Sequence, residues 1–182
     1  SGWTHLAYIT SWGDGNDGSG DVCATTDLVN MYEDGDIRLN LFMKNENDNL
    51  ITKYAGKAGS VPRETNIPVL RLSEMYLNRA EAISKGASIS GVTMRGDLEA
   101  IASKRNATVP ATPSVFDERR KELMFEGHIV YDYARTQTAL TRVDFDGTVN
   151  QNIPAAPDYR WAMPIPKREM DANPNMTQNP GY

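Results

Sequence analysis

Three acidic side chains recur at helical spacing in the second half of the chain. Glu118, Glu122 and Glu126 lie at positions i, i+4 and i+8, so they share one face of a predicted helix. Two acids on one helix face do not bracket a substrate bond as the carboxylates of a glycosidase must. Arg119 and Lys121 lie among them. The pattern therefore predicts a structural ion-pair network, and a catalytic pair or a partner contact remains as the alternative.

A second candidate for chemistry is the sequence Asp-Phe-Asp-Gly-Thr at positions 144–148. It is similar to the nucleophile loop of the haloacid-dehalogenase-like phosphatases, in which one aspartate attacks phosphorus and the other acts as acid and base. That fold requires a buried strand before the loop and a long α/β domain after it. Residues 140–142 form a poor strand, and residues 150–182 have the composition of a loop. We interpret the match as chance and predict no catalytic residue.

A third candidate is the polar segment 14–21, Asp-Gly-Asn-Asp-Gly-Ser-Gly-Asp. Oxygen ligands on alternate residues suit calcium. The register differs from that of an EF-hand, because Gly18 stands at the third acidic position and Ser19 at the glycine position. We therefore predict a solvated loop and no cofactor or metal, with calcium as the alternative.

Aromatic residues near the start of the chain could form a ligand site together with this loop. Sugar-binding proteins stack the apolar face of a pyranose on an exposed ring, while nearby amides and acids bind the hydroxyl groups. The candidate ligand-binding residues are Trp3, Tyr8, Trp12, Asp14, Asn16 and Asp17. Ordinary core packing is the alternative, and it applies to Trp3 and Tyr8 more than to Trp12.

Composition narrows the class of protein. The 182 residues are 40% hydrophobic and 24% charged, which suits one globular domain or part of a larger one. Nineteen basic and 24 acidic residues give a net charge of -5, which argues against nucleic acid as a partner. Cys23 is the single cysteine, so no internal disulfide can form. The sequence contains no apolar run of about 18 residues, and any lipid anchor is expected upstream of this chain.

The sequence predicts a mostly helical second half, and these helices must position the candidate residues. The predicted helices span residues 26–32, 70–85, 97–106, 114–125 and 129–135. Apolar side chains at helical spacing support the longest one, which Gly86 should end. The loop between the second and third helices is short, so these two should form an antiparallel αα-hairpin. Ser114 should cap the fourth helix, with Gly127 beyond its C-terminus.

The remaining segments read as loops and strands. Residues 1–25 are predicted as a strand and loop segment that carries the candidate ligand loop. Residues 26–135 form the helical part, in which 44–66 should be loop with one strand. Residues 136–182 are rich in proline and asparagine and are predicted to be extended and to wrap back over the helices.

Three segments together resemble the SusD/RagB family of outer-membrane nutrient-binding lipoproteins. Residues 70–82 are similar to that family's RLxExYLxxAEA helix, residues 117–128 to its DERRxELxFEGxR segment, and residues 164–182 to its PIPxxExxxNPNLxQNPGY ending. A weaker match covers residues 26–38. The residues that carry the family motifs are Arg71, Glu74, Glu81, Glu118, Arg119, Glu122, Glu126, Gly127, Asn173, Pro174, Asn179 and Pro180.

The resemblance implies that residues 1–182 are the C-terminal domain of such a protein, without most of its tetratricopeptide-like upstream half. It implies a mainly α fold of αα-hairpins, long loops and an extended tail. It also implies a non-enzymatic function at the cell surface, in the outer membrane, where an oligosaccharide or peptide is captured. The implied partner is a SusC-like TonB-dependent transporter. The alternative is a scaffold module that docks on the transporter without touching the nutrient.

Overall fold

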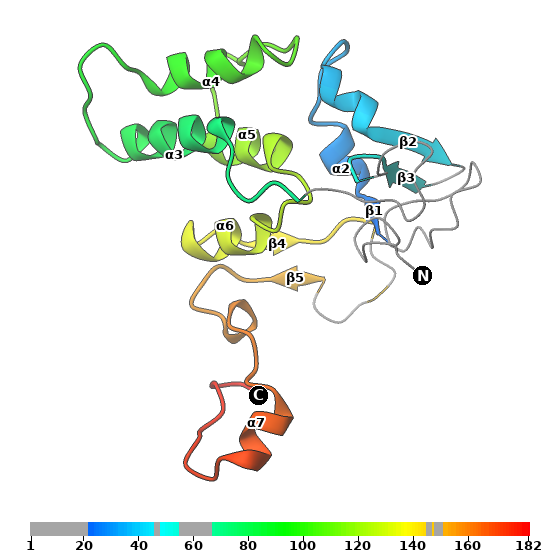
Figure 1. Cartoon of the computed structure of the whole chain (residues 1–182), viewed down its shortest axis with the longest axis vertical. Coiled ribbons are helices and arrows are strands. Elements are labelled where there is room, and N and C mark those ends of the chain that lie inside the picture. Colours follow the sequence, from blue (N-terminus) through cyan, green and yellow to red (C-terminus); the bar gives the residue numbers. More distant parts are fainter. Residues whose placement is uncertain (1–21, 46–47, 55–66, 145–146, 148–150) are drawn as a thin grey trace. The chain divides into compact units, whose positions relative to one another are not determined.

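The computed structural model describes residues 22–45, 48–54, 67–144, 147 and 151–182 (Figure 1). Within these ranges the chain forms six α-helices, two 3-10 helices and five short strands. The expected mainly α fold class is therefore confirmed. The chain divides into two compact units, Ser1–Glu126 and Gly127–Tyr182.

The first unit contains a small antiparallel sheet with the strand order β1-β3-β2. Strand β1 (Cys23–Ala24) pairs with β3 (Asp48–Ile51), which pairs in turn with β2 (Phe42–Asn45). Helix α2 (Thr26–Val29) follows β1, and the 3-10 helix η1 (Ile37–Leu41) precedes β2. One strand was expected within residues 44–66. The structure has β3 there, paired with β2. Leu50 and Ile51 bury their side chains, which stabilises β3 as the central strand.

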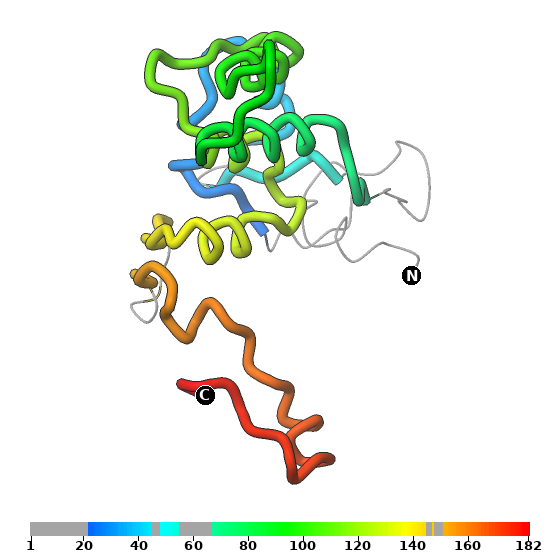
Figure 2. The backbone as a smooth tube through the Cα atoms, turned by 90° about the vertical axis from the view of Figure 1, so that its left-hand side faces the viewer, coloured from blue at the N-terminus to red at the C-terminus, as the bar shows by residue number. Residues whose placement is uncertain are grey.

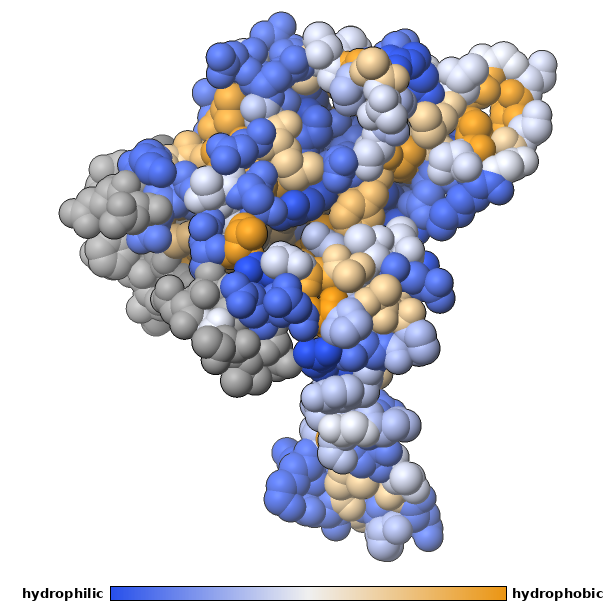
Figure 3. Space-filling model, turned by 180° about the vertical axis from the view of Figure 1, so that it is seen from behind, coloured by the Kyte–Doolittle hydropathy of each residue, from blue (hydrophilic) through white to orange (hydrophobic). Residues whose placement is uncertain are grey.

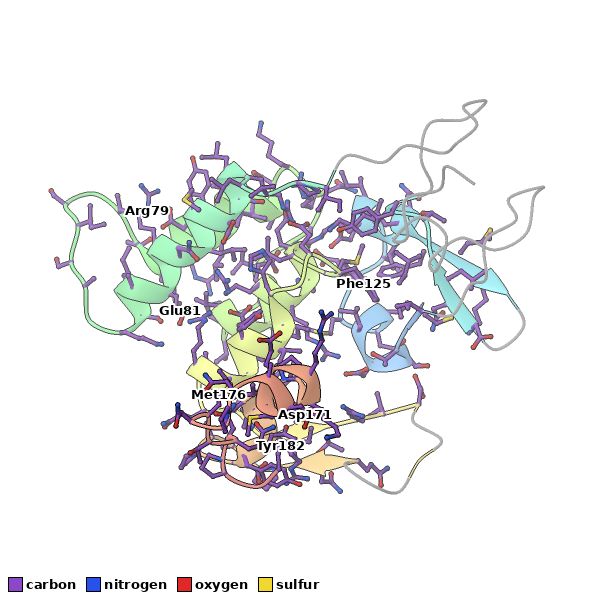
Figure 4. The ribbon with its side chains drawn as sticks, turned by 60° about the horizontal axis from the view of Figure 1, so that its bottom comes forward. Arg79, Glu81, Phe125, Asp171, Met176 and Tyr182 are labelled. Carbon is purple, nitrogen blue, oxygen red and sulfur yellow. The ribbon has the colours of Figure 1, made fainter. Side chains whose placement is uncertain are left out.

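Three helices form the larger part of this unit. Helix α3 (Leu72–Ser84) and helix α4 (Met94–Ala102) lie side by side as the predicted αα-hairpin, and α5 (Val115–Glu122) packs beside α3 (Figure 1). Arg79 on α3 (Figure 4) donates hydrogen bonds of 2.9 and 2.5 Å to the buried carboxylate of Asp97 on α4. This ion pair joins the two helices across their interface.

The observed helix ends can be compared with the ends that glycines and capping residues predict. Gly86 adopts φ +101° directly after α3, as expected for a glycine that ends a helix. Helix α4 begins three residues before the predicted Asp97, because the Thr93 hydroxyl accepts from the Gly96 amide and caps an earlier turn. The Ser114 cap is confirmed, since its hydroxyl accepts from the Asp117 amide.

The apolar side chains of α3 are not all buried. Leu72 is 71% exposed and Met75 is also exposed, whereas Tyr76 packs partly buried against the core. The fully buried face contains Leu77 and Ala80 instead. Helix α3 has apolar residues on more than one face, so spacing alone could not decide which face packs.

Two apolar cores meet at the C-terminal end of α5. One lies among α3, α4 and α5, and its buried residues are Leu77, Ala80, Leu98, Ile101, Val115 and Leu123. The other lies between the sheet and α2, and its buried residues are Ala24, Leu28, Tyr32, Ile51 and Met124. Neighbouring residues thus enter different cores, and Phe125 packs on the second one (Figure 4). This divergence explains why α5 ends at Glu122, five residues before Gly127, and not at the predicted Phe125.

The second unit begins with α6 (Ile129–Arg135), whose ends match the prediction. Strands β4 (Leu140–Thr141) and β5 (Asn152–Ile153) form an antiparallel pair. The 3-10 helix η2 (Tyr159–Trp161) follows. The Trp161 ring stacks on Tyr133 of α6 with centroids 6.0 Å apart, and its indole N–H donates to the Pro154 carbonyl.

The C-terminal tail was predicted to be extended. It is not extended throughout, because helix α7 (Lys167–Ala172) interrupts it. Pro166 precedes the helix and Lys167 pairs with Asp171 one turn on, and both features favour a helical turn. After α7 the chain turns back beside the preceding segment (Figure 2). The Gln178 side chain makes two hydrogen bonds to the backbone of Ile165, much as a neighbouring strand would.

Candidate functional site

The candidate ligand-binding residues all precede residue 22. Trp3, Tyr8, Trp12, Asp14, Asn16 and Asp17 therefore lie outside the residues that the structure describes, together with the whole segment 14–21. The ligand and calcium predictions for this part of the chain remain predictions. Within the described residues, no group of three His, Cys, Asp or Glu side chains is placed to hold a metal ion.

The phosphatase-like sequence lacks the context that its chemistry would need. Asp144 follows β4, a strand of two residues in which Thr141 is exposed. A nucleophile loop of that class follows a buried strand, so the local structure supports the interpretation of chance similarity. Asp146 lies outside the described residues.

The acidic row forms the centre of a buried ion-pair network. Glu122 is the hub, because its carboxylate accepts hydrogen bonds from three guanidinium groups. Arg38 donates at 3.0 Å, Arg71 at 2.6 Å, and Arg105 at 2.7 and 3.1 Å. The Glu122 side chain is 1% exposed. These three arginines come from η1, from the start of α3 and from the turn after α4, so one carboxylate joins three separate parts of the unit.

The other acids of the row extend the network at both ends. Glu118 accepts from Arg38 at 2.7 Å and from Lys121 at 2.7 Å. Glu126 accepts from Arg71 at 2.8 Å and from Lys53 at 2.5 Å. The predicted ion-pair network is therefore present in the structure, although Glu126 lies beyond the end of α5.

The sequence predicted Arg119 and Lys121 as the cations of the acidic row, and only Lys121 is confirmed, since it pairs with Glu118 at 2.7 Å. The Arg119 guanidinium donates to the Asn78 amide oxygen on α3 at 2.7 Å. Arg38, Arg71 and Arg105 take that role, from positions 17 to 84 residues away from Glu122. Spacing within one helix cannot reveal partners at such separations.

Electrostatics hold Glu122 in its charged form. Burial raises the pKa of Glu122, but the hydrogen bonds and positive charges of Arg105 and Arg71 outweigh it and lower the pKa from 4.5 to about 2. Asp36 completes the network by accepting from Arg38 at 2.7 Å. A carboxylate held in this way is a poor general base and cannot act as a general acid near neutral pH. This part of the molecule is therefore suited to a structural role.

The remaining motif residues also lie in structural contacts or turns. Glu81 pairs with Lys85 at 2.8 Å on α3, while Glu74 lies in the first turn of that helix. Gly127 has φ +83°, a conformation that favours glycine. In the tail, Asn173 follows α7 and accepts from the Asn175 amide.

The end of the tail is fixed in the same manner. Asn179 donates to the Met163 carbonyl at 2.6 Å, one residue before Pro180. The Tyr182 hydroxyl donates to the Ala162 carbonyl, and its ring meets Tyr159 edge to face at 5.3 Å. Gly181 lies so close to Tyr159 that a Cβ atom would overlap its ring. These contacts close the tail onto the segment before α7.

A cavity of about 310 Å³ adjoins the ion-pair network in the first unit. Arg38, Lys53, Arg71, Glu122 and Glu126 are among the side chains that line it. A second cavity of about 280 Å³ shares Arg71 and is bounded by α3 and the end of α4.

The described surface also exposes apolar side chains. They are concentrated before and at the start of α3, where Ile67, Val69, Leu70, Leu72 and Met75 are all exposed. Polar residues cover most of the face in Figure 3, with apolar residues in separate areas. In the part of the chain that the structure describes, no helix is long and apolar enough to cross a membrane.

The chain is a mainly helical protein whose motif residues form a buried ion-pair network and hold the C-terminal tail against the segment before α7. The model of the SusD family matches residues 43–182, and the chain belongs to that family. The family resemblance of the sequence is thereby confirmed.

Individual relatives agree with the family assignment. The starch-binding protein SusD of Bacteroides thetaiotaomicron is 32% identical over 126 residues, which cover 65% of this chain and 22% of SusD. A SusD superfamily protein from Bacteroides vulgatus superimposes with a TM-score of 0.80 at 29% identity, covering 97% of this chain and 42% of that one. Another, from B. thetaiotaomicron, gives 0.74 at 32% identity, with 96% and 43% covered. The chain thus spans less than half the length of these relatives.

Proposed function

We propose that this chain belongs to a surface protein that captures a glycan without chemical change and delivers it to a SusC-like TonB-dependent transporter. The observation that carries the proposal is membership of the SusD family together with 32% identity to a protein named for starch binding. An oligosaccharide is the favoured ligand, and a peptide is the other class to be tested.

The ionic hub supports a binding function over an enzymatic one. Each acid of the row is hydrogen-bonded to cations, and Glu122 accepts four such bonds. A glycosidase needs one carboxyl group that is protonated near neutral pH and one that faces substrate. A Glu122 pKa of about 2 does not meet the first requirement.

The proposed capture site is the aromatic and polar segment around Trp12. A ring beside carboxylate and amide groups offers the two contacts that a pyranose needs, stacking and hydroxyl hydrogen bonds. An open site of this kind buries less ligand than a closed pocket, so each glycan unit should bind with modest affinity.

A Trp12→Ala substitution in the full-length protein tests this site. Binding of maltoheptaose, measured by isothermal titration calorimetry, should weaken at least about tenfold, as expected when an aromatic anchor is removed. Tyr131→Ala is the matched control, because Tyr131 is an exposed aromatic residue on α6 outside the candidate segment. A panel of plant glycans, mucin fragments and peptides identifies the ligand class. Unchanged binding of every ligand by the Trp12→Ala protein would place the site elsewhere.

A docking function is the second candidate, and the exposed apolar run favours it. Five large apolar side chains between Ile67 and Met75 are exposed, and contiguous exposed apolar residues are typical of protein interaction sites. If the full-length protein binds its transporter but no member of the ligand panel, the scaffold function replaces capture. Lipid labelling of the full-length protein in its native outer membrane would test the proposed surface location.

A further inference from the structure

The 310 Å³ cavity beside the ionic hub has an unusual lining. Its charged side chains are five cations and two acids: Arg38, Lys53, Arg71, Arg105, Lys121, Glu122 and Glu126. Its apolar side chains are Ile37, Leu41, Pro68 and Met124. The volume lies at the lower end of the range for small-molecule sites, roughly 300–1,000 Å³. One monosaccharide unit is a ligand of suitable size.

The network around the cavity carries an excess of positive charge. The four acids that pair with the five cations are Asp36, Glu118, Glu122 and Glu126. Among the residues that the structure describes, these five positive and four negative charges leave a net charge of +1. A ligand with one negative charge would balance the network.

The hydrogen-bonding capacity of the wall points in the same direction. Each Glu122 oxygen already accepts two bonds, from Arg71 and Arg105 at Oε1 and from Arg38 and Arg105 at Oε2. Both oxygens are therefore saturated. The Lys53 ammonium, with three protons, bonds only Met124 O and Glu126 Oε1 among the described residues. Among the described residues, the Arg105 Nη1 group makes one hydrogen bond, a long one of 3.5 Å to the Lys104 carbonyl.

We propose that this cavity binds the carboxylate of an acidic sugar residue. Lys53 and Arg105 donate to the carboxylate, and the apolar wall formed by Leu41 and Met124 faces the C–H groups of the ring. A wall that offers donors beside the saturated Glu122 carboxylate favours a ligand group that only accepts hydrogen bonds. The sugar assignment rests on the proposed glycan-binding function.

The electrostatic state of Lys53 agrees with this arrangement. Burial and the nearby Arg71 charge lower the pKa of Lys53, and Glu126 only partly opposes them. A carboxylate in the cavity would raise that pKa again. The charged form of Lys53 would then be more stable with ligand than without it.

Binding of D-glucuronate to the full-length protein tests the inference by saturation-transfer NMR. D-glucose is the neutral control and N-acetylglycine supplies a carboxylate without a sugar ring. Glucuronate should bind saturably, and Lys53→Gln should weaken it at least about tenfold through loss of a charged donor. Lys85→Gln is the matched control, because Lys85 is an exposed cation that does not line the cavity. Thermal melting checks that each variant is folded.

A second variant guards against loss of folding in the first. Arg105→Lys retains the positive charge beside Glu122 but removes the forked donor, so glucuronate binding should weaken, and it is compared at a temperature at which melting shows the variant to be folded. Equal binding of glucose and glucuronate, or unchanged binding by both variants, overturns the inference. Equal binding of N-acetylglycine overturns the sugar assignment. Maltoheptaose separates the two proposals: a protein that binds it but not glucuronate refutes the acidic-sugar site and leaves glycan capture intact.

Discussion

Replacing Glu122 by glutamine removes the charge on which three guanidinium groups converge. The side chain keeps its size, but its amide group presents N–H donors to arginines that need an acceptor. The Glu122 carboxylate is 1% exposed and lies 2.6–3.1 Å from its donor nitrogens. Breaking a buried ion pair from one side typically costs about 3–5 kcal/mol of unfolding free energy.

The pKa of Glu122 gives a second route to the same magnitude. The pKa falls from 4.5 to about 2 in the folded protein, and about 1.4 kcal/mol per pH unit converts this difference to roughly 3 kcal/mol. Because the folded-state pKa is the lower one, this stability is fully present above about pH 5 and is lost as the pH falls toward 2. Near pH 3 about half of it should remain.

Urea unfolding of the full-length protein measures both quantities. At neutral pH the Glu122→Gln protein should be about 3 kcal/mol less stable than the wild type, and near pH 3 the difference should shrink by about half. Glu99→Gln is the matched control: Glu99 is 56% exposed and 3.6 Å from Arg95, so the change should be within about 0.5 kcal/mol. A Glu122→Gln effect below about 1 kcal/mol, or one that does not vary with pH, would refute the electrostatic argument.

Four further substitutions test the packing, a turn and a hydrogen bond by the same measurement. Leu77→Ala should cost about 2–5 kcal/mol because Leu77 is fully buried, whereas Leu72→Ala should cost under about 0.5 kcal/mol; similar costs would contradict the buried face of α3. Gly86→Ala should cost about 1 kcal/mol from its φ of +101° alone, since no atom lies near the new Cβ, and a stabilised variant would disprove that conformation. Tyr32→Phe should cost about 1–2 kcal/mol, because the Lys121 carbonyl loses its 2.9 Å donor; no loss would argue against this bond.

Features that depend on neighbouring residues could be predicted from the sequence. The ends of α6, the Ser114 cap and the stop at Gly86 follow from residues within one or two turns. The buried face of α3 could not be predicted, because Leu72 and Leu77 are equally apolar and only α4 and α5 determine which of them packs. The early start of α4 could have been recognised from Thr93, which stands three residues before the amide it caps.

The candidate site also has one part that neighbouring residues predict and one part that they do not. The acidic row was visible because its members share a helical spacing, and its interpretation as an ion-pair network followed from charge alone. Its cations come from three other parts of the chain, and Arg119, the local choice, bonds Asn78 instead. The contacts between these cations and the acidic row depend on tertiary packing, which the spacing of residues within one helix does not predict. The cavity beside the network was not predicted for the same reason.

Two of the motifs that identify the family supply residues that hold the first unit together. Arg71 belongs to one motif and Glu122 to another, 51 positions later, yet they meet at 2.6 Å. A change at either would remove one of the charged partners of the other from a buried network. The capture site proposed around Trp12 lies outside these motifs in the sequence, so ligand preference at that site can differ between proteins that share the motifs.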